Sequence, residues 1–215
     1  MLEKDVDFEH RIIDLSNKPD DFLAKYATVS SERAKVPLLE HGDDVIVIES
    51  DVVTRYVANQ VEGRSKTHDL GTQEKTSLAD AWGQVQLAVI NILKANSEEE
   101  VNRGMLEWHE AMQKLDQGVA NFEAEGLSPL TSFGVTECIV APWVWRMFVS
   151  LRVFRNIDVE TDELPKYPHA SRWLRAVRDR PSVEATCVSE AQLISSYRKF
   201  FVKYISPGAS AAETE

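Results

Sequence analysis

The chain has 215 residues, 43% of them hydrophobic, which is enough to bury one good core or two modest ones. Its formal net charge of −11 at pH 7 argues against a nucleic acid or an anionic membrane as the main partner, since phosphate binding needs a basic surface. No apolar run approaches the roughly 20 residues that span a bilayer, and the two cysteines form no recognisable motif, so we expect a cytoplasmic protein. Neither the cysteines nor the histidines have metal-ligand spacing, so we expect no metal site.

The first part of the chain alternates strand and helix patterns. We expect an edge strand over Phe8–Ile13, followed by turn residues that lead through Pro19 into a short helix. The spacing of Phe22, Leu23 and Tyr26 places these side chains on the buried side of that helix.

The stretch from Val36 to Val57 carries the strongest local pattern. Two β-rich runs, Val36–Glu40 and Val45–Ile48, flank the sequence HGDD, which predicts a hairpin with Pro37 at a strand end. An amphipathic helix is expected to begin with Ser50, directly after Glu49. Such a helix start offers free N–H groups and a positive dipole end to a small anion, but a Ser before an apolar helical run is usually an ordinary N-cap.

The second part of the chain is predicted to be entirely helical. We expect a polar linker over residues 61–73, the helical domain over residues 74–206 and a disordered tail over residues 207–215. Helical spacing of apolar residues predicts five helices, over Glu74–Ala95, Glu98–Glu125, Gly134–Phe154, Tyr167–Arg178 and Ser189–Tyr204. The arginines of the fourth helix and its end are expected to form a solvated face: Arg172, Arg175, Arg178 and Arg180.

The start of the third predicted helix carries a capping pattern. Glu137 stands three positions after Gly134, so its side chain can accept from the Gly134 N–H, and Phe133 can pack on Cys138. Cys138 is therefore expected to be a small core residue and not a nucleophile.

Several motifs together resemble one known family. The segment Asp14–Phe22 resembles an LxNKPxxF motif and Ala141–Arg146 resembles a PWxxR helix, both of the omega-class glutathione transferases. Val36-Pro37 and Glu49-Ser50 are similar to the glutathione-binding segments of the same family. The resemblance covers nearly the whole chain and implies an α/β plus all-α fold. An incomplete thioredoxin-like N-terminal domain over residues 1–60 would precede an all-helical glutathione-transferase C-terminal domain.

The resemblance also implies a glutathione site. Lys18 would lie beside the glycyl carboxylate, Val36 before a cis-proline would pair its backbone with the cysteinyl part, and Glu49 with Ser50 would hold the γ-glutamyl end. The implied glutathione-binding residues are Leu15, Lys18, Val36, Pro37, Glu49 and Ser50. Arg146 and Leu193 fall where the second domain lines the acceptor-substrate cleft, although an ion pair and a core leucine are equally good interpretations.

The chain departs from the family pattern at its beginning. The match starts at Met1, after the strand and the helix start that carry the Cys, Ser or Tyr nucleophile, and neither Cys138 nor Cys187 corresponds to that position. The catalytic residue is therefore unknown. This departure implies either a chain shorter than the working protein or a diverged, weakly catalytic relative.

Two functions follow from the resemblance. The first is an omega-like glutathione transferase or thiol transferase, with glutathione as co-substrate, that conjugates or reduces small hydrophobic electrophiles or disulfides in detoxification or redox chemistry. The alternative is a non-catalytic glutathione-transferase-fold protein that binds glutathione or serves as a scaffold. The family pattern further implies a homodimer formed through the helices over Glu74–Ala95 and Glu98–Glu125.

Overall fold

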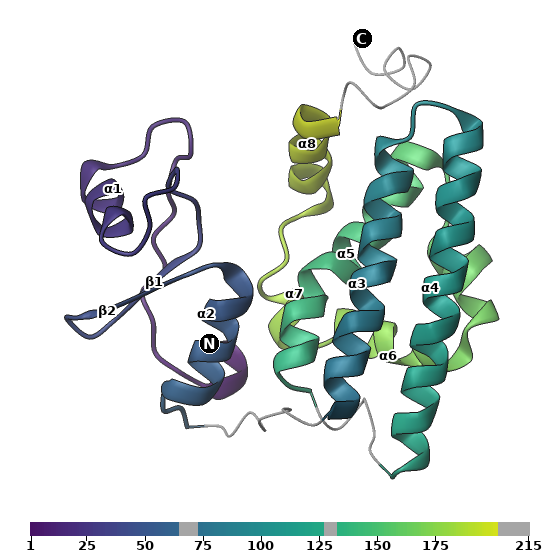
Figure 1. Ribbon diagram of the computed structural model, residues 1–215, viewed down its shortest axis with the longest axis horizontal. Helices are drawn as coiled ribbons and strands as arrows, with labels where there is room; N and C mark the ends of the chain where they lie inside the picture. The colour runs from purple at the N-terminus through teal and green to yellow at the C-terminus, as the bar shows by residue number, and fades with distance from the viewer. Residues whose placement is uncertain (65–72, 127–132, 202–215) are drawn as a thin grey trace. The chain divides into compact units, whose positions relative to one another are not determined.

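The computed structural model describes residues 1–64, 73–126 and 133–201 (Figure 1). Its contacts divide the chain into two compact units, Met1–Asp69 and Leu70–Glu215. The first unit holds both strands and the second is helical.

The first unit is built around a β-hairpin. Strands β1 and β2 pair antiparallel, with Leu38 opposite Ile48 and His41 opposite Val45. Gly42 follows β1 with φ of 65°, a left-handed conformation that glycine adopts without steric cost, so the hairpin predicted from HGDD is confirmed. The elements of this unit are η1 (Leu2–Lys4), α1 (Asp20–Ala27), β1 (Leu38–His41), β2 (Val45–Ile48) and α2 (Ser50–Gln60).

The strand predicted over Phe8–Ile13 is wrong. This segment has no regular structure, Ile12 is 85% exposed, and in the described residues β1 pairs with β2 alone. A strand needs a neighbouring strand to pair with its N–H and C=O groups, and the pattern of apolar residues in this segment does not reveal whether such a neighbour exists. Arg11 instead forms an ion pair with Asp21 at the start of α1.

A small core holds α1 against the rest of the first unit. Phe22 and Tyr26 are buried and cluster with Ala34, as their spacing of four residues predicts. Leu23 was expected on the same side, but it is 41% exposed, because the next residue along a helix points about 100° away.

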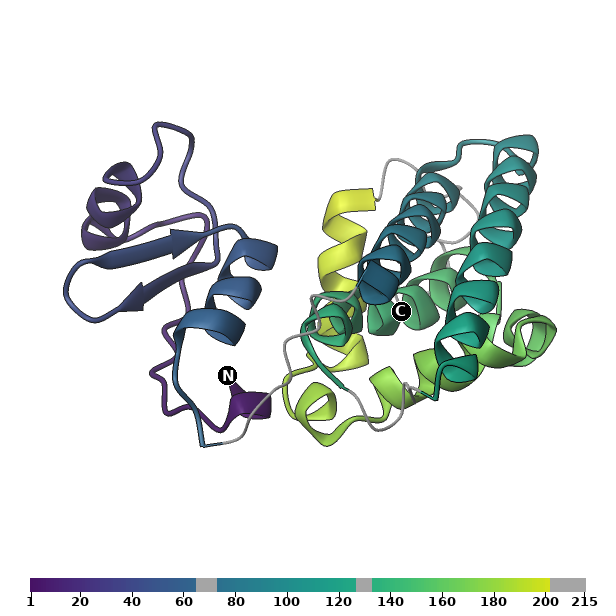
Figure 2. The same ribbon diagram turned by 60° about the horizontal axis from the view of Figure 1, so that its bottom comes forward.

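The second unit is a helical bundle with one large core. Helices α3 and α4 lie side by side in both ribbon views, and α5 contacts α3 (Figures 1 and 2). The core is centred on fully buried side chains such as Trp108, Leu115 and Trp173. The helices of this unit are α3 (Gln73–Lys94), α4 (Glu98–Ala124), α5 (Val135–Arg155), η2 (Val159–Glu163), η3 (Leu164–Lys166), α6 (Pro168–Arg178), α7 (Pro181–Glu184) and α8 (Glu190–Phe201).

The five long predicted helices correspond to α3, α4, α5, α6 and α8, each beginning within one residue of its prediction. The structure adds the short helices η2, η3 and α7, which have too few turns to show a period in the sequence. The predicted cap of α5 is confirmed: the Gly134 N–H donates to Glu137 Oε2 at 2.9 Å.

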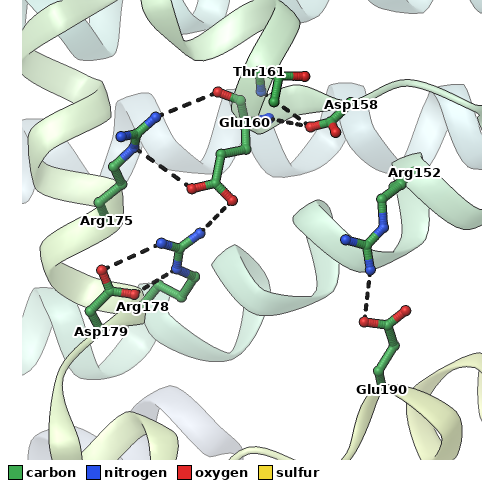
Figure 3. A network of polar contacts seen from close by, with 8 residues as sticks. All are labelled: Arg152, Asp158, Glu160, Thr161, Arg175, Arg178, Asp179 and Glu190. Carbon is green, nitrogen blue, oxygen red and sulfur yellow. Dashed lines mark hydrogen bonds and ion pairs between the residues drawn. The ribbon is translucent and has the colours of Figure 1, made fainter.

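The arginines at α6 are more than a solvated face. Arg178 Nη1 donates to Glu160 Oε2 at 2.8 Å and its Nε donates to Asp179 Oδ1 at 2.7 Å, as Figure 3 shows. Arg172 Nη2 donates to Glu123 Oε2 on α4 at 2.8 Å. These basic groups are therefore partly neutralised by neighbouring acids and tie α6 to α4 and η2.

Candidate functional site

The open end of the hairpin brings four of the predicted site residues together. Leu38 and Ile48 form the last pair of the ladder, so Pro37 and Glu49, the next residues along each strand, leave the sheet at the same end. The Val36–Pro37 peptide bond is cis. Val36 precedes β1, and Ser50 is the first residue of α2. We call Val36, Pro37, Glu49 and Ser50 the hairpin mouth.

The start of α2 faces this mouth with exposed polar groups. One interpretation of the sequence had Ser50 as the N-cap, but Glu49 occupies that position. The Val53 N–H donates to the Glu49 carbonyl oxygen at 2.8 Å. The first three N–H groups of a helix have no partner within it, and the dipole makes this end positive. Both Glu49 and Ser50 are exposed, so these donors are accessible to an anion.

Glu49 has an unusual backbone conformation. Its φ is 69° and its ψ is 128°, a region that side-chain-bearing residues rarely occupy and that costs on the order of 1–3 kcal/mol. The sharp turn lets the chain pass directly from β2 into α2. Residues held in such conformations cluster at functional sites, which fits a role for Glu49 in binding.

Lys18 is tied to the segment that enters the mouth. Its Nζ donates to the Ala34 carbonyl oxygen at 2.8 Å, and Ala34 is buried two residues before Val36. An ammonium has three N–H donors, and this bond uses one of them. Leu15 is 53% exposed and lies in the turn before α1. In this turn the Asn17 N–H donates to the Asp14 carbonyl oxygen.

Lys35 was not among the site residues predicted from the sequence. It directly precedes Val36, and its Nζ lies 2.9 Å from Glu32 Oε2, with both side chains exposed. The hydrogen bond with Glu32 raises the pKa of Lys35, and the Glu49 carboxylate adds to this effect. The only signal in the sequence is a lysine next to Val36 in a polar loop, which by itself indicates a solvated side chain.

The two acceptor-site candidates lie in the second unit. Arg146 is half-buried, with its guanidinium 4.8 Å from the centre of the Trp143 ring. Leu193 is 5% exposed, as the interpretation as a core leucine expects. The structure therefore gives Arg146 a stacking partner on its own helix α5 and places Leu193 inside the bundle.

Both cysteines are also in the second unit, as half-buried thiols. Burial raises the pKa of the Cys187 thiol, and the positive charge of Arg146 opposes this only in part. A raised pKa leaves less of the reactive thiolate at neutral pH, so Cys187 is poorly suited to nucleophilic attack. Among the described residues, no group of three His, Cys, Asp or Glu side chains could hold a metal ion.

Comparisons with known proteins show which family the chain resembles. Residues 1–65 match the family model of the glutathione S-transferase N-terminal domain. A curated relative, the probable glutathione transferase omega-2 of Caenorhabditis elegans, is 24% identical over 196 residues, which cover 88% of this chain and 74% of the relative. The chain is thus similar to glutathione transferases, both in its first 65 residues and over most of its length.

The fold of the chain also matches a solved structure. Leishmania TDR1, described as a unique trimeric glutathione transferase, superposes with a TM-score of 0.66 at 16% identity. The alignment covers 90% of this chain but 42% of the Leishmania chain. The small α/β unit followed by a helical unit is thus the glutathione-transferase fold. In the part of the chain that the structure describes, no helix is long and apolar enough to cross a membrane.

Proposed function

We propose that this protein is a glutathione-dependent transferase or thiol transferase of the omega type, and that the hairpin mouth binds glutathione. One observation carries the proposal: the Val36–Pro37 segment and the exposed start of α2 leave the sheet at the same end, and Lys18 is hydrogen-bonded to Ala34, two residues before Val36.

Each part of the tripeptide has a matching group in this arrangement. The N–H and C=O of Val36 stand before β1 and are suited to antiparallel pairing with the cysteinyl residue. The helix start at Ser50 and the Glu49 carboxylate match the carboxylate and the ammonium of the γ-glutamyl end. The Lys18 ammonium matches the glycyl carboxylate, and a charge-assisted contact of this kind contributes about 1.5–3 kcal/mol where water is excluded.

The bound thiol would serve as the nucleophile. In conjugation, the glutathione thiolate forms a bond to an electrophilic carbon and the leaving group departs with the bonding electrons. In reduction, the thiolate attacks one sulfur of a disulfide, giving a mixed disulfide and a free thiolate. The acceptor would be a small hydrophobic electrophile or a disulfide, with Arg146 and Leu193 as the candidate residues on the second unit.

We further infer that the protein is a cytoplasmic homodimer formed through α3 and α4. Leu87 on α3 and Leu106 on α4 are 52% and 65% exposed, which supports an apolar contact on these two helices. Sedimentation equilibrium of the whole chain would then give twice the mass of one chain.

A second candidate function is glutathione binding without turnover. This function is favoured because neither thiol of the described residues is suited to be the nucleophile. Both are half-buried in the second unit, and the pKa of Cys187 is raised. Such a protein would retain glutathione at the hairpin mouth but would not activate the glutathione thiol.

Calorimetric titration with glutathione, followed by conjugation and disulfide-reduction assays, tests the proposal. We expect K18M to weaken binding about tenfold, because it removes an ammonium contact worth about 1.4 kcal/mol. S50A should weaken binding by less than this, because it removes the Ser50 hydroxyl but keeps the N–H groups at the start of α2. K25M is the matched control, since Lys25 pairs with Glu40 in the same unit and belongs to no predicted site. Binding without turnover supports the second candidate, and no binding by the unaltered chain overturns both.

A further inference from the structure

We propose that Lys4 is a positioning residue for the hairpin mouth: it caps the far end of α2 and, through this helix, holds the helix start at Ser50 in place. This inference rests on the proposed function and deepens it, since the start of α2 belongs to the hairpin mouth. The observation that carries it is a pair of hydrogen bonds. Lys4 Nζ donates to the Ala58 carbonyl oxygen at 2.7 Å and to the Val57 carbonyl oxygen at 3.1 Å.

The end of α2 needs a cap from elsewhere in the chain. The last four carbonyl groups of a helix have no N–H partner within it, and the dipole makes this end negative. The last turn of α2 holds no basic residue, and Val61, which follows the helix, has extended backbone angles in place of the left-handed ones of a common C-cap. Lys4 therefore brings the donors and the positive charge that this end lacks, from more than 50 residues away in the sequence.

Neighbouring contacts hold the segment that carries Lys4. Arg64 Nε lies 2.7 Å from Asp5 Oδ2, and Arg64 Nη2 lies 3.1 Å from Asp7 Oδ1. The backbone of Gly63 approaches Lys4 so closely that a β-carbon at position 63 would lie 2.1 Å from the Lys4 carbonyl oxygen. The two ion pairs are exposed and contribute little stability by themselves, whereas the hydrogen bonds of Lys4 are partly shielded from water.

The two ends of α2 are coupled because the helix is short. It has 11 residues, and helices of fewer than about 12–15 residues are marginal in water unless other contacts hold them. Within Ser50–Gln60, all of which the structure describes, only Val57 is buried, and it belongs to the turn that Lys4 caps. Loss of the cap therefore loosens the whole helix, including the turn that presents N–H groups at the hairpin mouth.

Hydrogen exchange of the ¹⁵N-labelled whole chain tests this coupling without a ligand. We expect K4M to raise the exchange rates of the Thr54 and Val57 amides about tenfold, because it removes a charge-assisted contact from the helix. Thr54 reports on the first turn, since its N–H pairs with the Ser50 carbonyl group in an α-helix. K4R keeps the charge and should stay within about twofold of the unaltered protein. K25M, whose lysine pairs with Glu40 in the same unit, should change neither rate.

Calorimetric titration with glutathione connects the helix to the site. We expect K4M to weaken binding about threefold, which corresponds to an ordered helix start in about a third of the molecules. K4R should restore the affinity. G63A should resemble K4M, because the added methyl group displaces the Lys4 carbonyl group.

The possible results separate this inference from the proposed function. If K4M accelerates exchange at Val57 but not at Thr54, or if K4M binds glutathione as tightly as the unaltered protein, Lys4 is only a local cap and the inference is wrong, while the proposed function stands. If K4R behaves like K4M, the charge of Lys4 is not the cause and the inference is also overturned. If the unaltered protein does not bind glutathione, the proposed function fails and the positioning role fails with it, although exchange at Thr54 still decides whether Lys4 orders the helix start.

Discussion

Glu137 shows how much a single buried side chain contributes to the second unit. Its exposed fraction is 0%, Oε2 accepts from the Gly134 N–H at 2.9 Å, and Oε1 accepts from Trp173 Nε1 at 3.1 Å. One carboxylate thus caps α5 and fixes a core tryptophan of α6. The first contact follows from the sequence, because Glu137 is three residues from Gly134. The second does not, because Trp173 is 36 residues away.

We expect E137A to lower the free energy of unfolding of the second unit by about 2–4 kcal/mol, since it leaves two buried N–H groups without this acceptor. E137Q, which keeps one acceptor oxygen, should cost less. Urea unfolding followed by tryptophan fluorescence measures both. The control E125A replaces an exposed glutamate at the end of α4 and should change the free energy by less than about 0.5 kcal/mol. Equal effects of E137A and E125A would contradict this role.

Among the helices and strands, the elements that depend on local sequence patterns were predicted correctly, whereas those that depend on long-range partners were not. The hairpin and the start of α2 were predictable because their turn residues and apolar periods lie within a few positions. The strand over Phe8–Ile13 failed because a strand is defined by a neighbour that the local sequence does not reveal.

The start of α6 illustrates the same limit. Its first free N–H groups, those of His169 and Ala170, donate to Asp116 Oδ1 at 2.7 and 2.8 Å, and Asp116 lies on α4. Helix caps are normally sought next to the helix in the sequence, so this one was not predicted. The predicted site residues Lys18 and Val36 came from the resemblance, whereas the ion pair between Lys35 and Glu32 became visible only in the structure.

The ion pair between Arg11 and Asp21 anchors the segment over residues 8–13 to α1. The hydrogen bond from Arg11 is the largest cause that lowers the pKa of Asp21, from 3.8 to about 2, with burial opposing it. A carboxyl group whose pKa is lower in the folded than in the unfolded state stabilises the fold when the pH is above its pKa in the unfolded state. This contribution is therefore complete above pH 4 and is lost as the pH falls from about 4 to 2.

We expect R11M to move the pKa of Asp21 from about 2 back towards 3.8, which carbon-detected NMR titration of the carboxyl group measures directly. K25M should have a much smaller effect, because Lys25 is the weakest of the named causes. If the pKa of Asp21 stays at about 2 in R11M, the ion pair does not form in solution.

At the scale of the whole molecule, the two units differ in what they contain. All five tryptophans, at positions 82, 108, 143, 145 and 173, belong to the unit Leu70–Glu215. The large core belongs to the same unit, while the first unit has a small cluster around Phe22 and Tyr26. Tryptophan fluorescence therefore reports on the helical unit alone.

We expect the fragment over residues 70–215 to fold by itself, since its core of buried side chains is formed within it. Its thermal unfolding, followed by tryptophan fluorescence, should be a single cooperative transition from buried to exposed emission. Emission from solvent-exposed tryptophan at low temperature, with no transition, would show that the first unit is required.

Glutathione recognition at the hairpin mouth is tested most directly by NMR titration of the ¹⁵N-labelled whole chain with glutathione. We predict that the amide signals of Val36, Glu49 and Ser50 shift and saturate together, and that K18M raises the glutathione concentration needed for half-saturation about tenfold. Unchanged signals at these three residues, or saturable shifts confined to the helical unit, would contradict it.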